Sequence, residues 1–197
     1  MKTSNGFTLT RIIFAPIFFI LYYIPIWTGC FTKASLLIAI PLLCFAEFTD
    51  YLDGHYARKH NEVSDFGKIF DPFADVILHI TTFACLMFTT GSFNGYTPRL
   101  VFILIMYREM GQTFLRRVAA KKGVAIAARK GGKIKTVTYV VSGFYAIFLE
   151  LLVRLEMVPD FFGTLKIVSI CLFVISVILS YISFIDYLIH FGKTLKE

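Results

Sequence analysis

Residues 50–75 read DYLDGHYARKHNEVSDFGKIFDPFAD and join two long apolar stretches of the chain. Four aspartates lie in this segment, in two pairs with spacings of three and four residues: Asp50 and Asp53, then Asp71 and Asp75. Residues at these spacings share one face of a helix. Because the connection between the two pairs is short, we expect two antiparallel neighbouring helices whose carboxylates converge at one depth.

The apolar stretches on either side of this segment predict a membrane protein. Of the 197 residues, 57% are hydrophobic and 17% are charged, whereas about a quarter are charged in a typical soluble domain. A membrane-spanning helix needs about 20 predominantly apolar residues. We expect one all-α, polytopic transmembrane domain over residues 1–197, with six spans at about 7–28, 34–57, 67–90, 98–120, 135–155 and 162–190.

The basic residues predict how this bundle is oriented. The formal net charge is +7, from 20 Lys and Arg against 13 Asp and Glu. Six spans place both termini on one side, which holds 15 of the basic residues, while four lie on the other side and Arg108 lies within a span. Cytoplasmic loops carry the excess of Lys and Arg. We therefore expect a protein of the inner (cytoplasmic) membrane with both termini in the cytoplasm. The basic residues are expected to face membrane lipids and to bind no nucleic acid.

The four aspartates predict a metal site at the cytoplasmic edge of the membrane. Charged residues within spans are costly and usually functional. Converging carboxylates repel one another unless a cation lies between them, and Mg²⁺ or Mn²⁺ prefers such oxygen ligands. The alternative is that the aspartates cap helices or pair with nearby basic residues, which are Arg58, Lys59 and Lys68.

Small residues and one arginine complete a longer pattern around the aspartates. Gly54, Ala57 and Gly67 leave room beside the carboxylates, and the Arg58 guanidinium can hold a phosphate oxygen. The whole pattern, D-x2-D-G-x2-A-R-x8-G-x3-D-x3-D, resembles the signature of the CDP-alcohol phosphatidyltransferases, and all eight fixed residues match. The six-helix architecture of that family agrees with the number of expected spans.

The resemblance implies a reaction, its cofactors and a set of site residues. The family transfers a phosphatidyl or related group from a CDP-linked donor, here CDP-diacylglycerol, to an alcohol and releases CMP. Two Mg²⁺ or Mn²⁺ ions are implied at Asp50, Asp53, Asp71 and Asp75, with Asp75 also the general base for the acceptor hydroxyl. Donor contacts are implied at Asp50, Gly54, Ala57, Arg58, Gly67 and Thr8. A homodimer is also implied by the resemblance.

Four further basic residues suggest that the acceptor alcohol carries a phosphate. They are Arg108, Arg116, Lys133 and Lys135. They favour glycerol 3-phosphate or inositol phosphate over serine, choline or ethanolamine, because guanidinium and ammonium groups bind phosphate. The stretch GKIKT at 132–136 and the pair Arg108-Glu109 resemble the family members that use glycerol 3-phosphate. An alternative for Arg108 is a buried ion pair with Glu109, and Lys121, Lys122, Arg129 and Lys130 are expected to face water and lipid head groups.

Three departures and one rival function accompany this interpretation. Val76 stands where those members usually have Lys, the segment before Gly132 is unusually basic at Arg129 and Lys130, and Glu47 adds a carboxylate one turn before Asp50. These departures leave the acceptor open, with inositol phosphate or a choline- or serine-type alcohol as alternatives. The rival is a divalent-cation transporter, which would place its carboxylates near the bilayer midplane or along a pore.

Overall fold

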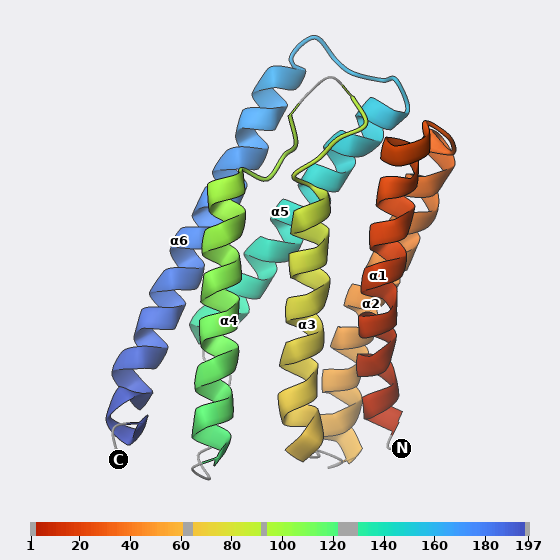
Figure 1. Ribbon diagram of the computed structural model, residues 1–197. Coiled ribbons are helices and arrows are strands. Elements are labelled where there is room, and N and C mark those ends of the chain that lie inside the picture. Colours follow the sequence, from red (N-terminus) through yellow and green to blue (C-terminus); the bar gives the residue numbers. More distant parts are fainter. Residues whose placement is uncertain (1–2, 61–64, 92–93, 122–129, 196–197) are drawn as a thin grey trace.

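The protein is a bundle of helices that run up and down (Figure 1). The computed structural model describes residues 3–60, 65–91, 94–121 and 130–195, with side chains over 8–49, 70–91, 94–121 and 131–191. The described residues contain no strand, which confirms the all-α class. In chain order the helices are α1 (Thr3–Thr28), α2 (Thr32–His60), α3 (Asp65–Cys85), α4 (Arg99–Lys121), α5 (Lys130–Arg154) and α6 (Phe162–Leu195).

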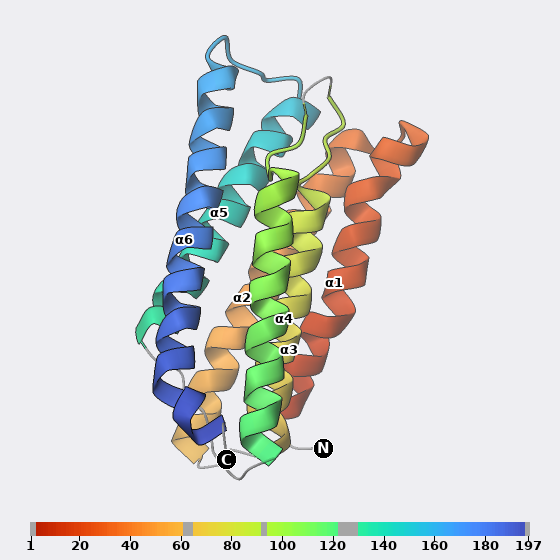
Figure 2. The same ribbon diagram turned by 60° about the vertical axis from the view of Figure 1, so that its left-hand side comes forward.

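The helices pack so that α3 and α4 lie in the middle of the bundle. Helix α1 packs against α2 and α3, α4 packs against α3 and α6, and α5 packs against α6. In the turned view α4 lies in front, with α6 on one side and α3 on the other (Figure 2). Both chain ends lie at the end of the bundle where α2 finishes and α3 begins (Figure 1).

Four helices of the described part of the chain are long and apolar enough to cross a membrane. Their apolar segments are Thr8–Thr28 in α1, Thr32–Thr49 in α2, Gly131–Arg154 in α5 and Phe162–Phe191 in α6. Large apolar side chains on the outside support a lipid-facing surface, since Ile20, Ile178 and Ile189 are 50%, 53% and 73% exposed. The chain is therefore a helical membrane protein.

An aromatic cluster joins three helices at the centre of the bundle. The Phe83 ring on α3 meets the Tyr139 ring on α5 and the Phe173 ring on α6, with centroids 5.3 and 5.1 Å apart and near-perpendicular planes. All three side chains are buried. Edge-to-face contacts of this kind add to the dispersion energy of the packed rings. The cluster fixes α3, α5 and α6 relative to one another. Its Tyr139 ring lies directly beside the Lys135 ammonium, which belongs to the candidate site described below.

The third helix is shorter than the sequence predicted. The expected span reached residue 90, but α3 ends at Cys85 and the chain turns back on itself. The backbone amides of Tyr96 and Thr97 donate to the Leu86 carbonyl oxygen at 2.7 and 3.1 Å. A Cβ atom at Gly95 would lie 2.0 Å from the Met87 carbonyl oxygen, so this close return requires glycine.

The fifth helix begins earlier than predicted, at Lys130 and not near residue 135. Gly131 and Gly132 are therefore helical, and they face α6. A Cβ atom at Gly131 would lie 3.2 Å from the Ser183 hydroxyl oxygen, and one at Gly132 would lie 3.8 Å from the Tyr187 hydroxyl oxygen. The two glycines let the first turns of α5 approach α6 closely.

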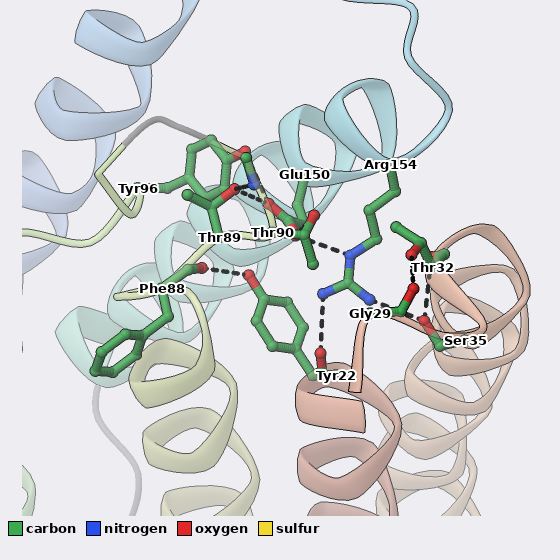
Figure 3. Close-up of polar contacts among 11 residues, drawn as sticks. Tyr22, Gly29, Thr32, Ser35, Phe88, Thr89, Thr90, Tyr96, Glu150 and Arg154 are labelled. Atoms are coloured by element: carbon green, nitrogen blue, oxygen red, sulfur yellow. Dashed lines mark hydrogen bonds and ion pairs between the residues drawn. The ribbon is translucent and has the colours of Figure 1, made fainter. Parts of the chain in front are cut away.

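A buried arginine, the last residue of α5, joins this helix to α1 and α2 (Figure 3). Helix α5 finishes at the end of the bundle opposite the termini (Figure 1). The Arg154 side chain is inaccessible to solvent and also stacks on the Tyr22 ring, 4.6 Å from its centroid. Its Nε, Nη1 and Nη2 donate to Glu150 Oε1, Ser35 Oγ and the Tyr22 carbonyl oxygen at 2.8, 2.9 and 3.0 Å. Arg154 is one of the four basic residues that the sequence assigned to the side opposite the termini, and its side chain is buried inside the bundle.

The carboxylate of Glu150 links this arginine to the connection between α3 and α4 (Figure 3). It accepts hydrogen bonds from the hydroxyls of Thr89, Thr90 and Tyr96 at 2.6, 3.1 and 3.0 Å, and from the Thr90 amide at 3.2 Å. Buried charges are tolerated when they are paired and fully hydrogen-bonded. We call Arg154, Glu150 and their partners the Arg154 network.

Candidate active site

Two of the four motif aspartates lie on α3 and face the first turns of α1. The Thr8 hydroxyl donates to Asp71 Oδ1, and Arg11 Nη1 donates to Asp75 Oδ1. The Arg11 side chain is buried, whereas that of Asp75 is 35% exposed. Thr8, which the resemblance places at the donor, thus contacts a motif carboxylate. The spacing of four residues predicted that Asp71 and Asp75 share a face, and both do point toward α1.

The remaining motif residues lie on helices, but their side chains are outside the described residues. Asp50, Asp53, Gly54, Ala57 and Arg58 belong to the last turns of α2, and Gly67 belongs to the first turn of α3. Helix α2 runs toward the end of the bundle from which α3 returns, so the two helices are antiparallel (Figure 1). The predicted convergence of all four carboxylates stays a prediction.

A cavity of about 220 Å³ opens beside Asp75 between α3, α4, α5 and α6. Asp75 and His79 of α3 lie on one wall, and Gly132 of α5 and Tyr187 of α6 contribute to the others. The cavity also contains all four basic residues that the sequence predicted to bind the acceptor phosphate, which are Arg108, Arg116, Lys133 and Lys135. The neighbouring arginine, Arg117, is exposed and does not line the cavity.

One buried carboxylate holds two of these basic residues in place. Glu109 Oε1 lies 2.7 Å from Arg108 Nη1 and 2.8 Å from Lys135 Nζ. The Arg108 Nε also donates to the Ser180 carbonyl oxygen at 3.1 Å, and the Lys135 ammonium lies 4.4 Å from the centroid of the Tyr139 ring. Arg108 therefore does form the buried pair with Glu109, and it lines the cavity as well.

The charge balance of the cavity favours an anion. Arg108, Arg116, Lys133 and Lys135 line it together with the carboxylates of Asp75 and Glu109. Asp75 is already paired with Arg11, and Glu109 is shared between two cations. Fixed positive charge of this kind in a partly dehydrated cavity binds phosphate strongly and orients it.

Sequence reasoning gave no role to four residues that the structure brings to the site. The sequence marks Arg11 as a basic residue ahead of the first span and as part of the family resemblance, and Glu47 as an extra carboxylate, but it gives neither a partner. In the structure Arg11 binds Asp75, and Glu47 Oε1 lies 3.6 Å from Nε2 of His79, the third of these residues. The fourth residue, Gln112, lies in the cavity wall. Its one signal in the sequence is a spacing of four residues from both Arg108 and Arg116, which places all three on one face of α4.

The described carboxylates fit the ions that the resemblance implies. Asp71 and Asp75 offer hard oxygen donors at helical spacing, and these are the ligands that Mg²⁺ and Mn²⁺ prefer. Among the described residues no group of three or more His, Cys, Asp or Glu side chains could hold a metal ion. A complete site at this place would therefore need Asp50 and Asp53 from α2 as well.

Comparisons with known proteins identify the family to which the chain belongs. The model of the CDP-alcohol phosphatidyltransferase family matches residues 1–182. The chain is 34% identical to the CDP-diacylglycerol–glycerol-3-phosphate 3-phosphatidyltransferase of Treponema pallidum (strain Nichols), over 100% of this chain and 92% of that protein. It is 38% identical to the protein of the same name from Bacillus subtilis (strain 168), over 67% and 69% of the two chains. The probable phosphatidylglycerophosphate synthase of Mycobacterium tuberculosis (strain ATCC 25618 / H37Rv) is 29% identical, over 93% and 78%. The chain belongs to the CDP-alcohol phosphatidyltransferase family.

Proposed function

We propose that this protein transfers the phosphatidyl group of CDP-diacylglycerol to glycerol 3-phosphate, which yields phosphatidylglycerophosphate and CMP. The observation that carries the proposal is a cavity that Asp75 lines together with Arg108, Arg116, Lys133 and Lys135. An acceptor with a phosphate fits a wall with four basic residues better than an uncharged or cationic alcohol does. The Treponema pallidum relative, named for this reaction, matches the chain along its whole length.

The acceptor phosphate is held by the basic wall of the cavity. Arg108 uses its Nε and Nη1 within the protein, and the rest of its guanidinium can donate to a phosphate oxygen. Because Glu109 fixes both Arg108 and Lys135, these two cations are oriented before the acceptor arrives. Preoriented charges lose little entropy on binding, which favours one position of the acceptor hydroxyl.

Asp75 accepts the proton of the attacking hydroxyl. The acceptor oxygen attacks the phosphorus that carries the diacylglycerol, a new P–O bond forms, and the P–O bond to CMP breaks. Arg11 holds Oδ1 of Asp75 and so orients the carboxylate at the edge of the cavity. A positioned general base of this kind accelerates proton transfer by about 10²- to 10⁴-fold.

The motif aspartates Asp50, Asp53, Asp71 and Asp75 would hold two Mg²⁺ or Mn²⁺ ions. When bound, such ions polarise the diphosphate and stabilise the charge of the departing CMP. Arg58 would bind a phosphate of the donor, while Gly54, Ala57 and Gly67 would leave space for its cytidine diphosphate. Thr8 orients Asp71 through its hydrogen bond.

We also propose that all six helices span the cytoplasmic membrane, with both termini and the active site on its cytoplasmic side. Both ends of the chain lie at the end of the bundle where α3 begins (Figure 1), and the side that holds the termini has most of the Lys and Arg residues. A water-soluble acceptor and a lipid donor can meet at that boundary. A homodimer, which the family resemblance implies, is part of the proposal, and cross-linking in native membranes tests it.

The test of the proposed function is CMP release by the purified protein in mixed micelles that contain CDP-diacylglycerol and Mg²⁺. One acceptor is supplied at a time: glycerol 3-phosphate, inositol phosphate, serine or choline. We expect release with glycerol 3-phosphate, its loss on chelation of the metal, and its return when Mg²⁺ or Mn²⁺ is added back. Release with inositol phosphate or choline but not with glycerol 3-phosphate would show that the proposed acceptor is wrong.

A further inference from the structure

One neutral side chain in the basic wall of the cavity has no hydrogen-bond partner. Gln112 lies one turn after Arg108 and one turn before Arg116 on α4, and it is 4% exposed. It lines the cavity, yet neither Oε1 nor Nε2 makes a hydrogen bond within the part of the chain that the structure describes. Burying an amide without partners is unfavourable, so partners are expected from whatever fills the cavity.

The chemistry of an amide indicates which part of a ligand it contacts. Gln112 offers one acceptor oxygen and two N–H donors, whereas a phosphate in this cavity would use its oxygens as acceptors only. A phosphate could therefore satisfy Nε2 but would leave Oε1 without a donor. The basic residues on either side of Gln112 already provide donors for phosphate oxygens. A hydroxyl group, which both donates and accepts, is the group that matches Oε1 and Nε2 together.

We propose that Gln112 recognises the hydroxyl group of the acceptor that does not react. The inference rests on the proposed function, in which the acceptor has a phosphate, a hydroxyl that attacks the donor, and a second hydroxyl. The basic wall binds the phosphate, Asp75 takes the proton of the attacking hydroxyl, and Gln112 binds the remaining hydroxyl through its amide. Gln112 is then a specificity-determining residue that selects a diol monophosphate over an acceptor with a single hydroxyl.

This role predicts a measurable preference, because a cavity built to hydrogen-bond a hydroxyl discriminates against an analogue without it. The analogue is 3-hydroxypropyl phosphate, which keeps the phosphate and one primary hydroxyl of glycerol 3-phosphate but lacks the hydroxyl between them. In the unmodified protein we expect kcat/KM, measured by CMP release, to be at least about tenfold higher with glycerol 3-phosphate. An equal kcat/KM for the two acceptors overturns the inference.

The decisive variant is Gln112→Met, which keeps the volume of the side chain and removes both hydrogen-bonding groups. We expect kcat/KM with glycerol 3-phosphate to fall about tenfold and kcat/KM with the analogue to change less than about twofold, so the preference disappears. A preference that stays unchanged in Gln112→Met overturns the inference. The matched control is Arg117→Met on the same helix, where an exposed residue outside the cavity is changed and the preference should remain.

A second variant keeps the inference testable if Gln112→Met does not fold. Gln112→Glu retains acceptor oxygens for the hydroxyl but places a negative charge beside the phosphate. We expect the KM for both acceptors to rise while the preference for glycerol 3-phosphate persists, and a loss of the preference in this variant contradicts the inference. Failure of the proposed function looks different, because the unmodified protein would then release no CMP with glycerol 3-phosphate.

Discussion

Arg154 and Arg116 are both arginines on helices of the bundle, but their surroundings differ. Arg154 is buried, and each of its three nitrogens donates to an oxygen from α1, α2 or α5 (Figure 3). Arg116 lines the cavity, and its buried Nε has no hydrogen-bond partner among the described residues. Both amide atoms of Gln112, one turn away, also lack a hydrogen-bond partner among the described residues.

The difference separates a structural polar cluster from the proposed binding site. In the Arg154 network every charge is paired, so the network stabilises one arrangement of helices and offers nothing to a ligand. In the cavity, Glu109 fixes two cations while Gln112 and Arg116 keep hydrogen-bonding groups that a bound molecule can use. Changes at the cavity should therefore affect catalysis or specificity, whereas changes in the Arg154 network should affect stability.

The largest effect is expected for Asp75→Asn, which removes the proposed base while retaining its shape. CMP release should fall by about 10²- to 10⁴-fold, the usual contribution of a positioned general base. The matched control is Asp160→Asn, an exposed carboxylate between α5 and α6, which should keep full activity. Full activity of Asp75→Asn would contradict both of its proposed roles, as base and as metal ligand.

The next largest effect is expected for Arg154→Met, measured as the free energy of unfolding in mixed micelles. Glu150 would remain buried without its cation, which typically costs about 3–5 kcal/mol. The double variant Arg154→Met/Glu150→Gln removes both charges and should recover part of this loss. If Arg154→Met lowers kcat of the folded protein but leaves its stability unchanged, the assignment of the Arg154 network as a structural cluster is wrong.

A smaller effect is expected for Lys135→Ala, which removes one basic residue of the cavity. The KM for glycerol 3-phosphate should rise about 10- to 100-fold, because a hydrogen bond to a charged group is worth about 1.5–3 kcal/mol. The KM for CDP-diacylglycerol should change much less. Lys121→Ala, an exposed lysine at the end of α4, is the control and should alter neither value. Equal increases in both KM values would argue against a role in acceptor binding.

The smallest effect is expected for Ser35→Ala in the Arg154 network. The Ser35 hydroxyl accepts one of the hydrogen bonds of Arg154, at 2.9 Å, while the ion pair with Glu150 remains. Loss of a single hydrogen bond should lower the free energy of unfolding by about 1 kcal/mol and leave CMP release unchanged. A loss as large as that of Arg154→Met would show that the ion pair does not dominate the network.

Much of the fold was predictable because the apolar segments are long and uninterrupted. All six predicted segments form helices, and the clearest errors are at the end of α3 and the start of α5. The hydrophobic residues 86–88 looked helical, but the chain turns at Cys85 because the residues that follow hydrogen-bond to Glu150 on a distant helix. At α5, Gly131 and Gly132 looked like a loop but are helical, since small residues allow the close contact with α6.

The candidate site was predictable only in part. The pattern of aspartates and the basic residues 108, 116, 133 and 135 could be found from spacing and from the family resemblance. The partnership of Arg11 with Asp75 could not, because the residues are 64 positions apart and lone basic residues near an N-terminus are common. Gln112 was missed because a glutamine among arginines has no chemical signature of its own; only its burial in a cavity makes it notable.

The amino-acid sequence alone was sufficient for the helical class, the order of the helices and, through the aspartate motif, the family. Helix formation in an apolar environment depends on local composition, since each backbone hydrogen bond is made within one segment. The partners of the buried polar groups depended on the packing of distant segments, as with Arg154, which binds the Tyr22 carbonyl oxygen 132 residues away. Packing completed the hydrogen bonds of Arg154 and left those of Gln112 open among the described residues, and the proposed acceptor site rests on that difference.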